Sequence, residues 1–119
     1  MPHQVVWFDV PVRNLDRAIQ FYSRVLAREV KKESEGMEIG VFSHSGDDVA
    51  GCLVRSDKEE PSDRGPLLYF NVAGRLDEAL TLVAECGGRV LLPKHSIGPY
   101  GYRAIVIDSE GNRIALHSE

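Results

Sequence analysis

The chain contains two similar halves. An apolar and aromatic run at 5–12 precedes the segment Leu-Asp-Arg-Ala-Ile at 15–19, and a similar run at 67–72 precedes Leu-Asp-Glu-Ala-Leu at 76–80. A repeat spaced by about sixty residues, half the chain, indicates a duplicated structural unit. Each unit is expected to be a strand, a helix and further strands. Two such units can bring similar sheets face to face around a cavity, so we expect the functional residues on strand faces.

Length and charge limit the kinds of partner. The 119 residues are enough for one domain with a single core. The 14 Lys and Arg and 18 Asp and Glu give a net charge of −4 without long runs of one sign, which argues against a nucleic-acid or anionic membrane surface. A small-molecule or protein partner is expected instead, and we favour a small-molecule ligand. No apolar run approaches a membrane span and the first residues lack a signal-peptide pattern, so we expect a cytoplasmic protein.

The first half, residues 1–55, is predicted to hold one helix and four strands. An apolar run predicts a strand over about 4–11 that ends at Pro11. Asn14 is a good N-cap, and apolar residues at three- and four-residue steps predict a helix over 15–27. Three further strand segments follow at 28–34, 37–43 and 49–55, and Gly36 breaks the strand pattern between the first and the second.

The second half, residues 67–119, repeats this βαβββ order after a polar linker at 56–66 that contains two prolines. A strand is predicted over 67–73, and a second helix with an apolar stripe from Leu76 to Val83 ends at Gly87 and Gly88. Strands at 89–92, 102–107 and 113–117 follow, with an irregular loop at 93–101 and a hairpin turn at 108–112.

Three motifs resemble the vicinal oxygen chelate superfamily, which includes glyoxalase I, bleomycin-resistance proteins, extradiol dioxygenases and fosfomycin-resistance enzymes. They are the segment at 14–22 after the first strand, Glu-Cys-Gly-Gly-Arg-Val at 85–90, and Asp-Ser-Glu-Gly-Asn-Arg-Ile at 108–114. The resemblance covers essentially the whole chain. It implies an α+β fold in which two βαβββ modules form an open, cupped β-sheet barrel around a pocket. Because such sheets leave edges and an open face, a homodimer is also expected.

Strand alternation then predicts which side chains face the pocket. We expect Phe8, Val10 and Val12 to pack beneath the helix, whereas Val5, Trp7 and Asp9 should face the pocket. The candidate ligand-binding residues are Trp7, Tyr69, Asn71, His95, Tyr102 and Arg113, and the candidate catalytic residues are Asp9 and His117.

Each candidate also has a structural interpretation. Asp9 is either a general base in an apolar pocket or a structural carboxylate bonded to backbone or to Arg113. His117 is either a base or an exposed residue at a strand end. His95 lies on a loop that either folds over the pocket or is a plain connection. The aromatic residues are either a pocket lining or core.

The metal ligands of the superfamily are not found. Metal-dependent relatives hold a divalent ion with His or Gln on the first strand and Glu on the last strand of each half. The corresponding positions here are Trp7, Cys52, Leu67 and Ala115. A shift of two residues brings in Asp9, Val54, Tyr69, Asn71 or His117, but no His and Glu quartet results. We therefore predict no metal and no cofactor, and we expect Cys52 and Cys86 to be buried free thiols.

Two functions remain open from the sequence. The first is a glyoxalase-related enzyme, of the lyase or isomerase type, that acts on a small oxygenated or aromatic metabolite without the usual metal. The second is a non-catalytic ligand-sequestering protein of the bleomycin-resistance kind. A metal-dependent lyase or dioxygenase would follow if the ligand alignment were different.

Overall fold

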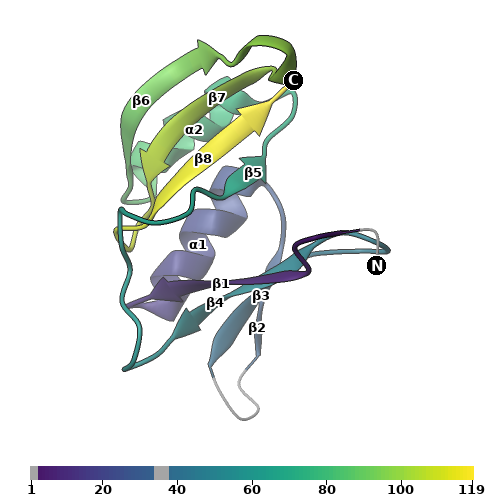
Figure 1. Cartoon of the computed structure of the whole chain (residues 1–119). Helices are drawn as coiled ribbons and strands as arrows, with labels where there is room; N and C mark the ends of the chain where they lie inside the picture. Colours follow the sequence, from purple (N-terminus) through teal and green to yellow (C-terminus); the bar gives the residue numbers. More distant parts are fainter. Residues whose placement is uncertain (1–2, 34–37) are drawn as a thin grey trace.

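The computed structural model describes residues 3–33 and 38–119 as two βαβββ halves, each with one helix on a four-stranded sheet (Figure 1). The first half contains β1 (Trp7–Val12), α1 (Leu15–Leu26), β2 (Val30–Glu33), β3 (Ile39–Phe42) and β4 (Ala50–Arg55). The second contains β5 (Tyr69–Asn71), α2 (Leu76–Glu85), β6 (Arg89–Ser96), β7 (Tyr102–Ile107) and β8 (Arg113–Ser118). The α+β class and the repeated βαβββ order are confirmed. The predicted break at Gly36 and the predicted strand start at Met37 lie outside the described residues.

The two sheets have the same topology. Their strand orders are β1-β4-β3-β2 and β5-β8-β7-β6, and the first strand of each half runs parallel to the last. The remaining pairs are antiparallel. The sheets are cupped and do not close into a barrel, so β1, β2, β5 and β6 are edge strands.

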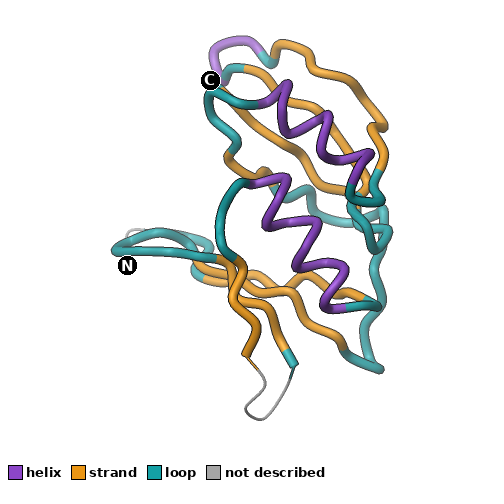
Figure 2. Tube along the Cα trace, turned by 180° about the vertical axis from the view of Figure 1, so that it is seen from behind, coloured by secondary structure: helices purple, strands orange, loops and turns teal. Residues whose placement is uncertain are grey.

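A shared core joins the halves. Figure 2 shows both helices on the same side of the molecule, where α1 and α2 are in contact. The ring centroids of Phe8 and Phe70, one from each half, lie 5.8 Å apart, and buried Tyr22 on α1 lies 5.4 Å from Phe42 and from Phe70. Because the helix sides of both sheets are used in this one core, the opposite faces of both sheets are left uncovered. Within the described residues, no helix is long and apolar enough to cross a membrane.

Two strand boundaries differ from those predicted. β1 begins at Trp7 and continues through Pro11, where a strand end was expected. Proline is tolerated there because β1 is an edge strand, and the missing N–H removes no ladder bond from a second neighbour. β5 is only three residues long, Tyr69–Asn71, and Leu67 precedes it.

The loop predicted at 93–101 is wrong for its first four residues. β6 extends to Ser96, so Pro93 and His95 lie within a strand. The pairing of β6 with β7 shifts register between Val90 and Leu92 and again between Leu92 and His95. Such irregularities on an edge strand accommodate proline, which local sequence patterns treat as a strand breaker. Only Gly98–Tyr100 forms a separate 3₁₀ turn.

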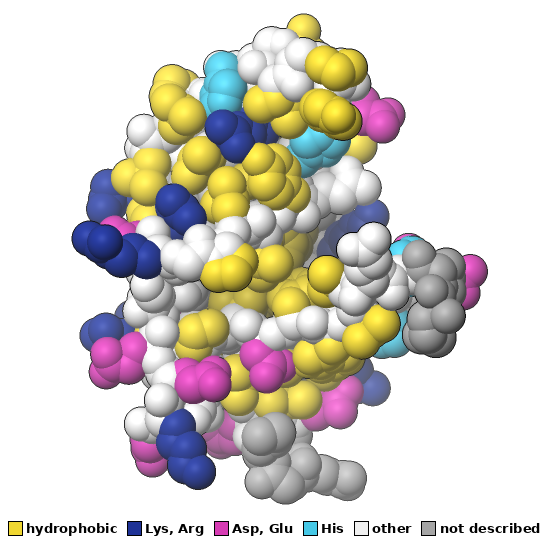
Figure 3. All heavy atoms as spheres, in the orientation of Figure 1, with side chains coloured by type: hydrophobic (Ala, Val, Ile, Leu, Met, Phe, Trp, Pro, Cys, Tyr) yellow, Lys and Arg dark blue, Asp and Glu magenta, His cyan; other side chains and the backbone are white. Residues whose placement is uncertain are grey.

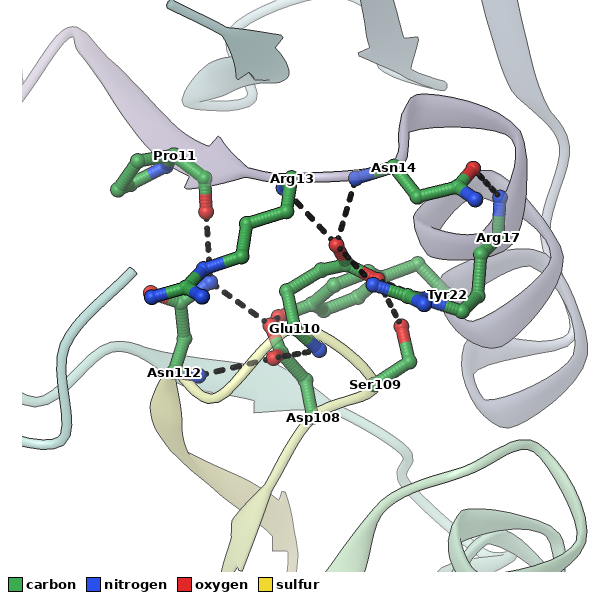
Figure 4. A network of polar contacts seen from close by, with 9 residues as sticks. All are labelled: Pro11, Arg13, Asn14, Arg17, Tyr22, Asp108, Ser109, Glu110 and Asn112. Carbon is green, nitrogen blue, oxygen red and sulfur yellow. Dashed lines mark hydrogen bonds and ion pairs between the residues drawn. The ribbon is translucent and has the colours of Figure 1, made fainter. Parts of the chain in front are cut away.

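The turn between β7 and β8 binds the first half through Glu110 (Figure 4). The Oε1 atom of Glu110 accepts hydrogen bonds from the backbone N–H groups of Arg13 at 2.9 Å and Asn14 at 2.8 Å. Its Oε2 atom lies 2.7 Å from Nε of Arg17. Burial alone would raise the pKa of Glu110, but the hydrogen bonds from Arg17, Asn14 and Arg13 outweigh it and the pKa is lowered.

The same turn holds a second buried carboxylate, Asp108. Its Oδ1 atom accepts the backbone N–H groups of Glu110 and Asn112. The Asn112 side chain donates to Asp108 Oδ2 at 3.0 Å and to the carbonyl oxygen of Pro11 at 2.8 Å. The turn therefore fixes the second half against the start of α1 and the end of β1.

Candidate ligand-binding site

Equivalent residues of the two halves occupy equivalent places in their sheets. Trp7 pairs with Ala50 in the first half, as Tyr69 pairs with Ala115 in the second. One step further, Asp9 pairs with Cys52. Asn71 pairs with His117 in the same way. In these pairings Tyr69 takes the place in the second sheet that Trp7 takes in the first.

On the uncovered face of the first sheet, Asp9 is a hydrogen-bonded carboxylate. Its Oδ1 atom accepts from Trp7 Nε1 at 2.8 Å and from Cys52 Sγ at 3.3 Å. Burial, followed by the hydrogen bond to Asp9, raises the pKa of the Cys52 thiol to about 12. The partners of Asp9 are thus Trp7 and Cys52. The alternative partner, Arg113, instead donates from Nη2 to the carbonyl oxygen of Gly65 at 2.8 Å.

On the uncovered face of the second sheet, four polar residues form a row across the strands. Asn71 of β5 pairs with His117 of β8, His117 with Arg103 of β7, and Arg103 with His95 of β6. Directly paired residues point to the same face, so this row lies on one side of the sheet. The equivalent row of the first sheet consists of Asp9, Cys52, Val41 and Lys31.

Arg103 links the row to Tyr69. Its Nε donates to His95 Nε2 at 3.0 Å and its Nη1 donates to the Tyr69 hydroxyl at 2.5 Å. The Arg103 guanidinium lies 5.9 Å from the centre of the Tyr69 ring. His117 lies edge-on to the same ring, with centroids 6.3 Å apart, and its Nε2 donates to the carbonyl oxygen of Tyr100 at 2.6 Å.

Arg103 was not among the predicted site residues, whereas Tyr102 was. Tyr102 pairs with Ser118, so it lies on the opposite, helix-facing side from Arg103 and His117. There the Lys94 ammonium lies 5.8 Å from the centre of its ring. The hairpin turn at 108–112 contained the missing signal, because pairing Ile107 with Arg113 and counting outward places residue 103 opposite residue 117.

Three hollows adjoin these groups. The polar hollow, about 380 Å³, is lined by Tyr69, Asn71, Ala73, His117 and Glu119. The junction hollow, also about 380 Å³, lies between the halves; Tyr69 and Asn71 line it together with apolar residues that include Val5, Phe8, Phe42, Leu68 and Phe70. The linker hollow, about 320 Å³, is lined by Asp9, Arg113 and residues of the 56–66 segment.

None of these three hollows of the described residues is lined by Trp7, Asp9, Tyr69 and Asn71 together, as one common cavity would require. Asp9 and Arg113 line the linker hollow, whereas Tyr69 and Asn71 line the other two. The reason is the shared core: the helix sides of the two sheets meet, so their opposite faces do not enclose one space. His95, Tyr69, Asn71 and His117 are brought together on the second sheet.

The residues at the superfamily's metal positions do not fit a divalent ion. Indole, phenol and methyl groups at Trp7, Tyr69 and Ala115 are not ordinary ligands for such a site. The remaining position, Cys52, offers a single thiol in place of the imidazole and carboxylate ligands of the superfamily. Across residues 3–33 and 38–119, no group of three or more His, Cys, Asp and Glu side chains is placed to hold a metal ion.

The two uncovered faces differ in charge. Figure 3 shows basic and His side chains over the second sheet and acidic side chains across the first half, with apolar side chains between them. In the second sheet the row contains Arg103 and two His residues and no acidic residue, whereas the row of the first sheet contains one charge of each sign, Asp9 and Lys31.

The sequence and the fold both have known relatives. A family model described as the Glyoxalase/Bleomycin resistance protein/Dioxygenase superfamily matches residues 4–116. No curated protein shows a significant sequence match to this chain.

Three solved structures illustrate the likeness of fold. A glyoxalase/bleomycin resistance protein from Albidiferax ferrireducens has a TM-score of 0.77 at 15% identity, covering 98% of this chain and 99% of that one. A glyoxalase-related enzyme from Fulvimarina pelagi has a TM-score of 0.76 at 16% identity, covering 98% and 88%. The fosfomycin resistance protein FosX from Listeria monocytogenes has a TM-score of 0.74 at 15% identity, covering 98% and 92%. At these identities the structures agree in fold alone, but the family match spans nearly the whole sequence: the chain belongs to the glyoxalase/bleomycin resistance protein/dioxygenase superfamily.

Proposed function

We propose that the protein is a cytoplasmic small-molecule-binding protein that takes up an oxygenated or aromatic metabolite on the uncovered face of its second sheet. The observation that carries this proposal is the position of Tyr69 and Asn71, which line both the polar hollow and the junction hollow. A ligand lying across them would place its apolar part in the junction hollow, whose lining includes Val5 and Leu68, and its polar part near His117. Tyr69 is 48% exposed, so its ring is accessible to a ligand. Superfamily membership supports a small ligand of this kind.

We propose in addition that the protein forms a homodimer. Both sheets leave one face uncovered, and the edge strand β6 exposes Val90, Leu91 and Leu92 at 40%, 42% and 42%. Trp7 is 45% exposed on the other sheet. Exposed apolar groups on sheet edges and faces favour association with a second copy. Analytical ultracentrifugation at micromolar concentration is expected to give twice the chain mass, and a single 13.2 kDa species would contradict the dimer.

Binding is favoured over catalysis because the two candidate catalytic residues are apart. Asp9 lines the linker hollow and His117 the polar hollow, so within one chain they do not act on the same reacting atom. General acid–base chemistry requires its groups within hydrogen-bond reach of one substrate. An enzyme would therefore use either Asp9 or His117 alone within one chain, or bring the two together in a dimer.

Two tyrosines of similar exposure allow a controlled test. Tyr69 is 48% exposed and Tyr102 is 45% exposed, on opposite faces of the same sheet. Isothermal titration with a panel of aromatic acids, keto acids and hydroxy acids is expected to find a ligand whose affinity falls at least tenfold in Tyr69→Ala and stays within twofold in Tyr102→Ala. Equal losses in both variants would contradict the site.

Turnover is measured on the same samples, because the relatives suggest two reactions to try. The substrates are the methylglyoxal–glutathione adduct and fosfomycin, each with and without added Zn²⁺, Ni²⁺ or Mn²⁺. Binding without turnover supports the sequestering function. Metal-dependent turnover that is lost in Asp9→Asn would instead establish an enzyme and overturn the binding-only proposal.

A further inference from the structure

Arg103 is held in place by two neutral groups and by no carboxylate. Its Nε donates to His95 and its Nη1 to Tyr69. The ion pairs within residues 3–33 and 38–119 involve Arg17, Arg24, Lys32, Arg75 and Lys94, and none involves Arg103. A guanidinium fixed on a sheet face without a counter-charge is suited to bind an anion from solution.

The acceptor atoms of His95, Tyr69 and Asn71 each already accept one hydrogen bond. His95 Nδ1 lies 2.9 Å from the carbonyl oxygen of Pro93, which can only accept, so Nδ1 carries the hydrogen and Nε2 is the acceptor for Arg103. The Tyr69 hydroxyl oxygen accepts from Arg103. Asn71 Oδ1 accepts from the backbone N–H of Ala73 at 2.8 Å.

Three hydrogen-bond donor groups near Arg103 remain without a partner among residues 3–33 and 38–119. In the described part of the chain, the Tyr69 hydroxyl hydrogen, the Asn71 amide N–H₂ and the Arg103 Nη2 group have no hydrogen-bond partner. Tyr69 and Asn71 line the polar hollow, and Arg103 contacts the hydroxyl of Tyr69 without itself lining the hollow. One acidic side chain, Glu119, is among the residues that line this hollow. Three donors and a positive charge select for an anionic oxygen group over a neutral one.

We propose that Arg103, Tyr69 and Asn71 form the subsite for the anionic group of the ligand, a carboxylate or a phosphonate. This inference rests on the proposed function and assigns the charge class of the metabolite bound there. Arg103 supplies the charge, while Tyr69 and Asn71 donate hydrogen bonds. His95 acts as a positioning residue, because its Nε2 fixes the plane of the guanidinium and leaves Nη2 available.

The subsite is tested with three probes of similar shape: benzoate, phenylphosphonate and the neutral benzamide. The full-length protein is titrated with each by NMR, following the side chains of His117 and Tyr69. The variant is Arg103→Gln, and its matched control is Arg89→Gln, which removes the same charge at the other end of the β6–β7 pair, opposite Ile107. We expect the wild type to bind benzoate and phenylphosphonate at least tenfold more tightly than benzamide. Arg103→Gln should lose this preference, whereas Arg89→Gln should keep it within twofold.

A second variant tests the positioning role of His95. His95→Ala is expected to weaken benzoate binding threefold or more while benzamide binding is unchanged. Arg103→Lys is expected to retain only part of the preference for anions, because lysine keeps the positive charge but lacks the planar, two-pronged donor geometry of the guanidinium. If all probes bind with equal affinity, or if Arg103→Gln keeps the preference, the anion subsite is wrong and the proposed binding function stands. If none of the three probes perturbs His117 or Tyr69 at millimolar concentration, both the subsite and the proposed function are overturned.

Discussion

The hydroxyl of Tyr22 donates a hydrogen bond to Oδ2 of Asp108 across 2.5 Å, although the two residues are 86 positions apart in the chain. Tyr22 lies on α1 of the first half, and Asp108 begins the β7–β8 turn of the second (Figure 4). Both are almost completely buried. Burial, followed by the charge and hydrogen bond of Asp108, raises the pKa of Tyr22 well above its usual value, so the phenol remains a donor over the ordinary pH range. The bond therefore joins the two halves at their shared core.

Tyr22→Phe is expected to destabilise the protein by about 1–3 kcal/mol, since the buried carboxylate of Asp108 would lose one of its hydrogen-bond donors in a site closed to water. The free energy of unfolding is measured by urea denaturation. Tyr69→Phe is the matched control because its hydroxyl is on an exposed face, and its effect should stay within about 0.5 kcal/mol. Equal effects in the two variants would mean that the buried bond does not stabilise the fold.

Glu110 is expected to make the free energy of unfolding depend on pH in the acidic range. Its pKa is lowered in the folded state from the model-compound value of 4.5, so its contribution is complete above about that pH and is lost as the pH falls through the folded pKa. Glu110→Gln should be less stable than wild type at pH 7 but should lose less stability between pH 5 and lower values. Glu85→Gln, at an exposed ion pair with Arg24, is the control and should follow the wild-type curve. A wild-type-like acid dependence in Glu110→Gln would contradict the role of this carboxylate.

Gly51→Ala is expected to destabilise the fold by about 1–3 kcal/mol through overpacking. A methyl group on Gly51 would lie 2.5 Å from Cζ of Phe8, whose ring is fixed in the shared core. Thermal denaturation measures the loss. Phe8→Leu in the Gly51→Ala background should recover part of the stability, and strictly additive losses would show that the ring is not the obstacle.

Cys52 is expected to react slowly with iodoacetamide at pH 8, because its pKa is raised to about 12. The partly exposed Cys86 should be modified first. Asp9→Asn should keep the fold and increase the Cys52 rate several-fold, since the carboxylate is the second cause of the raised pKa after burial. Mass spectrometry of the two cysteine peptides follows both rates in one sample. An unchanged Cys52 rate in Asp9→Asn would leave burial as the whole cause.

Much of the fold was predictable because its signals are local. The helix at 15–26 follows from its apolar spacing and from Asn14, whose side chain accepts from the backbone N–H of Arg17 at 3.0 Å. The hairpin turn at 108–112 follows from Gly111, whose φ is 103°. Strand alternation correctly placed Val10 and Val12 in the core, since a residue's face in a strand depends only on its position in the sequence.

The pairings between distant segments depended on the tertiary structure. The position of His95 opposite Arg103 requires the irregular register of β6 with β7, and the place of Pro93 within β6 requires that this strand be an edge. The partners of Glu110 lie more than ninety residues away. Above all, the sequence determined that two like sheets would form, but only packing decided that their helix sides would share one core. Packing Phe8, Tyr22 and Phe42 of the first half against Phe70 of the second removes apolar surface from water, and this arrangement leaves the polar rows of the two sheets on separate, uncovered faces.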